Sequence, residues 1–169
     1  MERETSIASQ RGVGLLEVLI ALLVLAVGVL GFAGLQMTAL NKSNDANHRA
    51  AAVLIAQDVI ERFELNPSKR EEYLKVSNWK EGSVGDDPDD NCITNECDAG
   101  AIAEWDMDQL AWQAANLLPA GRVLAAECDF NTQMTCVIVS WDEQDPAKCM
   151  DGGLEAGVDS HCFVLEVAR

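Results

Sequence analysis

The cysteines are the residues whose type and spacing carry the clearest chemistry in this sequence. The chain of 169 residues has six, an even number that favours disulfides and an oxidising compartment. Successive pairs of cysteines bracket a short loop, a predicted hairpin and a glycine-rich loop, so sequential pairing is favoured among the 15 arrangements that six cysteines allow. The expected disulfides are Cys92–Cys97, Cys128–Cys136 and Cys149–Cys162.

Other reactive constellations are missing from the sequence. It contains no G-x-S-x-G, H-E-x-x-H or P-loop motif. A zinc site is the weaker alternative for the cysteines, because there is no C-x-x-C pair and the only histidines are His48 and His161. Neither histidine has an evident serine or cysteine nucleophile as a partner. We therefore expect a protein that is not an enzyme and that holds no metal and no cofactor.

Glu17 is a carboxylate at the start of a long apolar run. The 18 residues from Val18 to Leu35 carry no charge, and as a helix they would be about 27 Å long, close to the hydrocarbon thickness of a bilayer. An ionisable residue at such a position is a functional-site hypothesis by default. A plain transmembrane anchor leaves Glu17 unexplained. A cleaved secretory signal could use the small residues around Gly31, but the apolar run is longer than such signals have.

Gly12 directly precedes Val13, and Glu17 is the fifth residue counted from Val13. This arrangement, followed by a long apolar helix, resembles the class III signal of type IV pilins and pseudopilins. Val13 and Leu16 depart from the residues most common in that family, whereas Gly12 and Glu17 fit it. The resemblance implies that a prepilin peptidase cuts after Gly12 and methylates the new amino terminus of Val13.

The resemblance also gives Glu17 a role in subunit assembly. Cleavage creates an ammonium group at Val13, and a buried unpaired charge is very costly. Glu17 of one subunit can pair with the Val13 amine of its neighbour, and only the correct axial offset satisfies both charges. The alternative is that Glu17 only reaches towards the membrane interface.

The predicted helix continues beyond the apolar run. No proline occurs before Pro67, and Ala52, Ala56, Val59 and Phe63 recur at helical spacing. We expect one helix over residues 14–66, with a protruding hydrophobic half at 13–37 and an amphipathic half at 38–66. Gly28, Gly31 and Gly34 lie near the end of the apolar run, where they permit either close helix packing or local unwinding.

The remaining residues, 67–169, predict a globular head. A short second helix is expected around 102–117, ended by Pro119. Alternating residues predict strands over 122–128, 134–141 and 161–167. A long helix followed by an antiparallel sheet of three or four strands defines the α+β class, and with the amino-terminal signal it is similar to the type IV pilin fold.

Features of the head are similar to PilV-type minor pilins: Asn66-Pro67 after the long helix, tryptophans in the second helix, Leu118-Pro119-Ala120-Gly121, and a strand that ends at Trp141. This resemblance implies a minor pilin in a complex that primes type IV pilus assembly, helps present a tip adhesin, and supports twitching motility and attachment. The implied partners are other minor pilins, the major pilin, a tip adhesin, the prepilin peptidase and the inner-membrane assembly platform. The implied location is the inner membrane, with the head in the periplasm, and then the pilus.

Three other functions remain alternatives. A minor pseudopilin of a type II secretion system would have the same fold. A DNA-uptake pilin needs a basic stripe, and the excess of 28 Asp and Glu over 12 Lys and Arg argues against nucleic acid as a partner, so none is expected. A secreted enzyme would need a cleaved signal.

The acidic run Asp86–Asp90 is a candidate for calcium binding, because carboxylate oxygens are calcium ligands. It lacks the EF-hand spacing, so a solvated loop is favoured.

Replacing Gly12 with valine tests the predicted cleavage. A peptidase that closes on the backbone at Gly12 has no room for a branched side chain, so Gly12→Val should remain as the full precursor. Gel mobility and intact mass of the membrane-bound protein give the readout. Efficient maturation of this variant would return the secretory-signal interpretation to contention.

Overall fold

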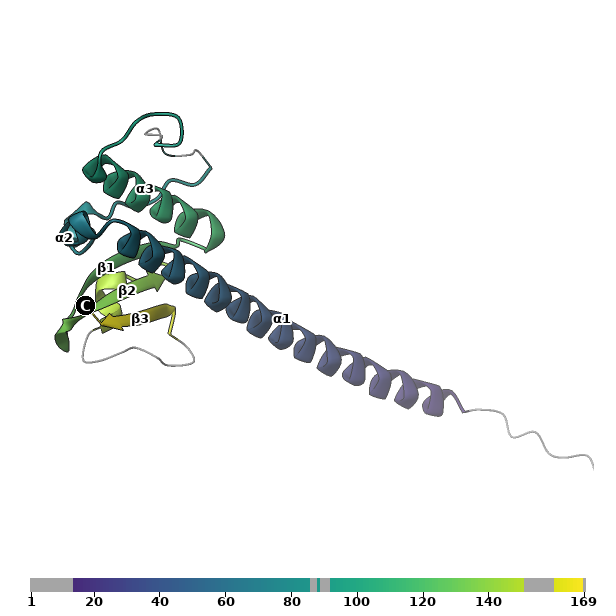
Figure 1. Ribbon diagram of the computed structural model, residues 1–169. Coiled ribbons are helices and arrows are strands. Elements are labelled where there is room, and N and C mark those ends of the chain that lie inside the picture. Colours follow the sequence, from purple (N-terminus) through teal and green to yellow (C-terminus); the bar gives the residue numbers. More distant parts are fainter. Residues whose placement is uncertain (1–13, 86–87, 89–91, 151–159, 169) are drawn as a thin grey trace, which may run out of the picture. The chain divides into compact units, whose positions relative to one another are not determined.

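The computed structural model describes residues 14–85, 88, 92–150 and 160–168 (Figure 1). Residues up to Asn44 form one compact unit, and residues from Asp45 onward form a second. Gly12 and Val13 lie outside the described residues, and so does most of the acidic run at 86–90.

Helix α1 (Leu15–Leu65) contains 51 residues, which makes it about 77 Å long (Figure 1). It is long and apolar enough to cross a membrane. The predicted range of 14–66 was one residue too long at each end. Asn66 ends the helix because the proline that follows disfavours helical backbone there.

The first unit consists of the amino-terminal part of α1. Every residue from Gly14 to Asn44 is exposed, including 16 large apolar side chains. A helix that is apolar on all sides and is not buried by the described part of its own chain is suited to surroundings other than water.

The second unit begins with the remainder of α1, which is apolar on one face only. The residues of this face that become buried are Ala52, Ile55, Ala56, Val59 and Phe63. The face predicted from the sequence is therefore confirmed, with Ile55 added to it. After α1 come the short helices η1 (Pro67–Lys69), α2 (Arg70–Tyr73) and η2 (Val76–Asn78).

Helix α3 (Ala99–Leu117) is the predicted second helix, and its start is capped by Asp98. The Asp98 carboxylate accepts hydrogen bonds from the backbone N–H groups of Gly100 and Ala101, both at 2.9 Å. These bonds lower the pKa of Asp98. Three of the six buried residues of α3 are alanines, whereas Trp105 and Trp112 are partly exposed. Its buried residues are Ala103, Asp106, Met107, Leu110, Ala111 and Ala114.

The described residues contain one three-stranded antiparallel sheet with the order β1-β2-β3. The strands are β1 (Arg122–Cys128), β2 (Asn131–Ser140) and β3 (Cys162–Ala168), with η3 (Pro146–Met150) between the last two. The main core lies where the amphipathic half of α1, helix α3 and one face of the sheet meet. Leu110, Val139 and Trp141 are fully buried there.

Two glycines allow the chain to pass directly over α3. A Cβ atom on Gly121 would lie 2.0 Å from the carbonyl oxygen of Ala114, and one on Gly82 would lie 2.0 Å from that of Ala111. No side chain fits at such a distance, so both positions require glycine for steric reasons. Gly121 thereby directs the chain from α3 into β1.

Gly121→Ala should lower the free energy of unfolding by at least about 2 kcal/mol, because the backbone must move to accommodate the new methyl group. Gly100→Ala is the matched control: its nearest neighbour is a carboxylate oxygen of Asp98 at 3.3 Å, which has to move by only a few tenths of an ångström, and alanine favours helix by about 1 kcal/mol. Urea unfolding of the full chain in detergent, followed by tryptophan fluorescence, measures both. Equal stability of the two variants would refute the close approach at Gly121.

Candidate functional site

Glu17 lies in the first turn of α1 and is exposed. Its backbone N–H donates to the carbonyl oxygen of Gly14 at 2.9 Å, so the residue is already part of the helix. A carboxylate in the first turn interacts favourably with the positive end of the helix dipole. Val18, Ala21, Leu22 and Leu25 form an apolar surface beside it.

From Val18 to Asn41 the helix has no further charge. Glu17 is therefore the one acidic group on the described part of the first unit, followed along α1 by a continuous apolar surface. Such a surface can associate with lipid or with other apolar helices. In both surroundings the carboxylate needs a cation, because an unpaired charge is costly there.

The three glycines near the end of the apolar run do not interrupt α1. Atoms built as Cβ on Gly28, Gly31 and Gly34 would have nothing within 4 Å, so another helix could approach closely at each position. The Thr38 hydroxyl donates to the carbonyl oxygen of Gly34 at 3.1 Å, an interaction that stays within the helix.

A buried polar network joins α1, α2 and α3 in the second unit. The Arg62 guanidinium donates to Asp58 at 2.9 Å and to Asp106 at 2.8 Å, and the Tyr73 hydroxyl donates to the other oxygen of Asp106 at 2.5 Å. Asp106 is 6% exposed and Tyr73 is fully buried. The ring of Trp105 lies 5.6 Å from the guanidinium carbon, within range of a cation–π contact.

The interactions within this network keep the Tyr73 hydroxyl protonated and the Arg62 guanidinium charged. Burial raises the pKa of Tyr73, and the hydrogen bond to Asp106 raises it further. Burial opposes the charge of Arg62, but the bonds to Asp58 and Asp106 outweigh it and raise the pKa of the guanidinium. The network therefore fixes the orientation of the head helices and contains no group poised for catalysis.

The sequence gives only a partial signal for this network. Asp58 and Arg62 show the i, i+4 spacing of a helical ion pair. Asp106 is less obvious, because it is one of many acids and its burial depends on how α3 packs. Asn66 is a further polar residue with a structural role: its side-chain amide donates to the carbonyl oxygen of Ala99 at 2.8 Å and so ties the end of α1 to the start of α3.

The three sequential disulfides are present in the structure: Cys92–Cys97, Cys128–Cys136 and Cys149–Cys162. Cys128 and Cys136 are not directly opposite each other in the hairpin. Cys136 faces Ala126, and an irregularity between Glu127 and Cys128 brings the two cysteines to a Cα separation of 5.0 Å. Cys149–Cys162 links η3 to β3, and both of these cysteines are buried.

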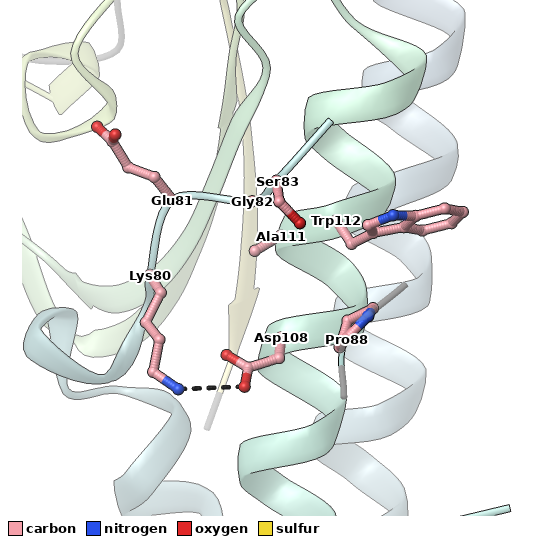
Figure 2. A pocket seen from close by; sticks show the side chains of 8 residues that line it. All are labelled: Lys80, Glu81, Gly82, Ser83, Pro88, Asp108, Ala111 and Trp112. Carbon is pink, nitrogen blue, oxygen red and sulfur yellow. Dashed lines mark hydrogen bonds and ion pairs between the residues drawn. The ribbon is translucent and has the colours of Figure 1, made fainter. Parts of the chain in front are cut away.

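A hollow beside α3 is lined by residues from the loop after η2 and from α3 (Figure 2). Its volume is about 310 Å³, and Lys80 and Asp108 form an ion pair of 3.1 Å at one side, while Glu81 points away from them. The lining residues include no histidine or cysteine. Among the described residues, no group of His, Cys, Asp and Glu could hold a metal ion.

Comparisons with known proteins agree with this arrangement. Residues 7–33 match the family model described as the prokaryotic N-terminal methylation motif, and residues 34–108 match the model described as type IV pilin Tt1218. No curated protein and no solved structure matches the chain.

The two matches adjoin each other and identify the chain as a member of the type IV pilin superfamily. The predicted resemblance and the α+β pilin fold are confirmed. Pilin domains are structural subunits and not enzymes, so the predicted lack of catalysis is confirmed by the family. The match to the methylation motif implies processing by a prepilin peptidase and assembly with other pilus subunits.

The single tyrosine of the chain offers a direct test of the buried network. Its phenolate absorbance should titrate above pH 10 in the folded chain and return to about pH 10 in urea. Below pH 10 the tyrosine is protonated in both states and contributes fully to stability. Above it the unfolded chain loses its proton first, so stability should fall as the pH rises.

Tyr73→Phe is the matched variant for this titration. It should remove the alkaline loss of stability and cost about 1–3 kcal/mol at neutral pH, because Asp106 loses a donor in a buried site. A folded-state titration midpoint at or below pH 10 would contradict the hydrogen bond between Tyr73 and Asp106.

Proposed function

We propose that this protein is a minor pilin of a type IV pilus, in which the apolar part of α1 is both the membrane anchor and the filament-core helix. The observation that carries the proposal is the continuous exposed apolar surface of α1 with Glu17 at its amino-terminal end. This surface has no cover within the described chain, and a bilayer before assembly and a helical bundle after assembly would both cover it.

The proposal divides the chain into four segments. Residues 1–12 are the leader peptide, which is removed by cleavage between Gly12 and Val13. Residues 13–37 are the hydrophobic segment, with a methylated amine at Val13. Residues 38–66 are the amphipathic half of the helix, and residues 67–169 are the head, which lies in the periplasm while the protein waits in the inner membrane.

Within the filament, Glu17 neutralises the Val13 amine of a neighbouring subunit. The methylated amine keeps its positive charge, so both groups would be buried charges unless they meet. The pair thus selects one axial offset between subunits, which apolar side chains alone would leave open.

The charge of the head supports a minor rather than a repeating subunit. Residues 67–169 carry 21 Asp and Glu against 7 Lys and Arg. Heads of one sign repel one another where they are packed within a Debye length, which is about 8 Å at physiological salt. A few copies among other subunits avoid this repulsion. The PilV-like features of the head agree with a place in a priming complex that helps present a tip adhesin, in support of twitching motility and attachment.

Variants of Glu17 test the proposal. Glu17→Ala and Glu17→Gln should be cleaved normally but should be depleted in sheared filaments, because the buried ammonium loses a partner worth about 3–5 kcal/mol. Val18→Ala, which keeps the carboxylate, is the matched control and should be incorporated. The amounts in membranes and in sheared pili, measured by immunoblot, give the result.

Normal levels of both Glu17 variants in sheared pili would contradict the charge pairing. Deletion of the gene separates the two machines that use this fold. Loss of piliation and twitching supports the type IV pilus, whereas loss of protein secretion with normal pili would assign the chain to a type II secretion system.

A further inference from the structure

The two edge strands of the sheet differ in how far they are buried by the rest of the described chain. β1 forms one edge, and four of its consecutive residues, Val123–Ala126, are buried beneath neighbouring segments that include α3, η2 and η3. β3 forms the other edge (Figure 1). Its main contacts are with β2 and η3, and its residues from Phe163 to Val167 are all partly exposed.

The hydrogen-bond pattern indicates which backbone groups of β3 point away from the sheet. The N–H of Trp141 donates to the carbonyl oxygen of His161 at 3.0 Å. Residues of an antiparallel pair alternate between bonding to the partner strand and bonding away from it. Phe163, Leu165 and Val167 therefore bond to β2, while Val164 and Glu166 direct their N–H and C=O groups outward.

Cys162 agrees with this alternation. It precedes Val164 by two residues, and its N–H donates to the Ser160 hydroxyl at 3.2 Å instead of to β2. Within the described part of the chain, no residue forms a hydrogen bond to the outward groups of Val164 or Glu166. They form a short row of unused donors and acceptors with the spacing of a β-strand.

Edge strands in monomeric proteins usually carry a device that prevents pairing, such as a lysine, a proline, a bulge or a covering segment. β3 has no lysine and no proline, and its register with β2 is regular. It is apolar on both faces: Phe163 and Leu165 pack against the main core, and Val164 packs against the cluster around the disulfides. Its only charge is Glu166.

We propose that the outer edge of β3 binds an extended segment of a neighbouring, different pilus subunit as a fourth strand of the sheet. The unused backbone groups require an extended partner, and the two apolar faces require alternating apolar side chains. Glu166 selects a lysine or arginine opposite it. A second copy of this chain is disfavoured as the partner by the acidic charge of the head. The inference rests on the proposed function, because it takes the partner to be a pilus subunit.

Val164→Pro tests the fourth strand without disturbing the ladder to β2. The proline removes an N–H that points outward, a position where sheets tolerate proline. Val164→Thr has nearly the same shape and keeps the N–H, so it is the matched control. Loss of this one backbone bond should reduce incorporation of the proline variant into sheared filaments by about five- to tenfold, and the threonine variant should stay within about twofold of wild type.

Hydrogen exchange of the wild-type chain supplies the direct readout. In detergent, the amides of Val164 and Glu166 should exchange at least about tenfold faster than those of Phe163 and Leu165. In filaments all four should be protected. Glu166→Lys should reduce incorporation more than Glu166→Gln does, because it places like charges opposite each other.

Each remaining outcome overturns a specific statement. Protection of Val164 and Glu166 already in detergent would mean that the chain covers its own edge or pairs with a second copy, and the proposal would be wrong. A wild-type chain present in filaments with these amides unprotected would overturn the fourth strand and leave the proposed function standing. A wild-type chain absent from filaments would overturn the proposed function and the partner together.

Discussion

The apolar surface of the first half of α1 must be removed from water, and the other features of the protein depend on how this is done. No residue between Gly14 and Asn44 is buried by the rest of the described chain. Apolar surface contributes roughly 25 cal/mol for each Å² taken out of water, so association with lipid or with other helices is strongly favoured. Association of this kind is not directional by itself. Glu17 determines where the associating helices lie relative to one another, because a charge in apolar surroundings has to meet an opposite charge at a defined position.

The second half of α1 has a different role, which is to form part of the core of the head. Its apolar residues occupy one face, and that face forms the core with α3 and the sheet. The head has 103 residues and few large aromatic side chains, so it depends on additional constraints. Three disulfides each contribute about 2–3 kcal/mol by restricting the unfolded chain. The network of Arg62, Asp106 and Tyr73 adds directional bonds between α1, α2 and α3.

The main elements could be predicted from the sequence because local patterns determine them. The uninterrupted apolar run and Pro67 define α1, and the alternation from Val137 to Trp141 defines the central strand. The bounds of β1 agree with the prediction, while β2 begins three residues earlier than predicted and both β2 and β3 are shifted by one residue at their later ends. Glu17 could be found because it is a single carboxylate beside 18 uncharged residues.

Other features depend on tertiary packing and leave little trace in the sequence. Helix α3 buries Ala103, Ala111 and Ala114, and neighbouring backbone passes close to its carbonyl groups at Gly82 and Gly121. The burial of Asp106 follows from that packing. The position of Cys128 relative to Cys136 depends on an irregularity in the hairpin, and the unpaired edge of β3 depends on the strand order.

The most direct test of the account is the intact mass of the wild-type chain extracted from membranes. If the apolar part of α1 is the retained anchor of a pilin, the mature protein begins at Val13, carries one methyl group on its amino terminus and contains no free thiol. A mature protein that begins near Gly34 would show that the apolar helix is removed as a secretory signal, and the account of α1 as an assembly helix would be wrong.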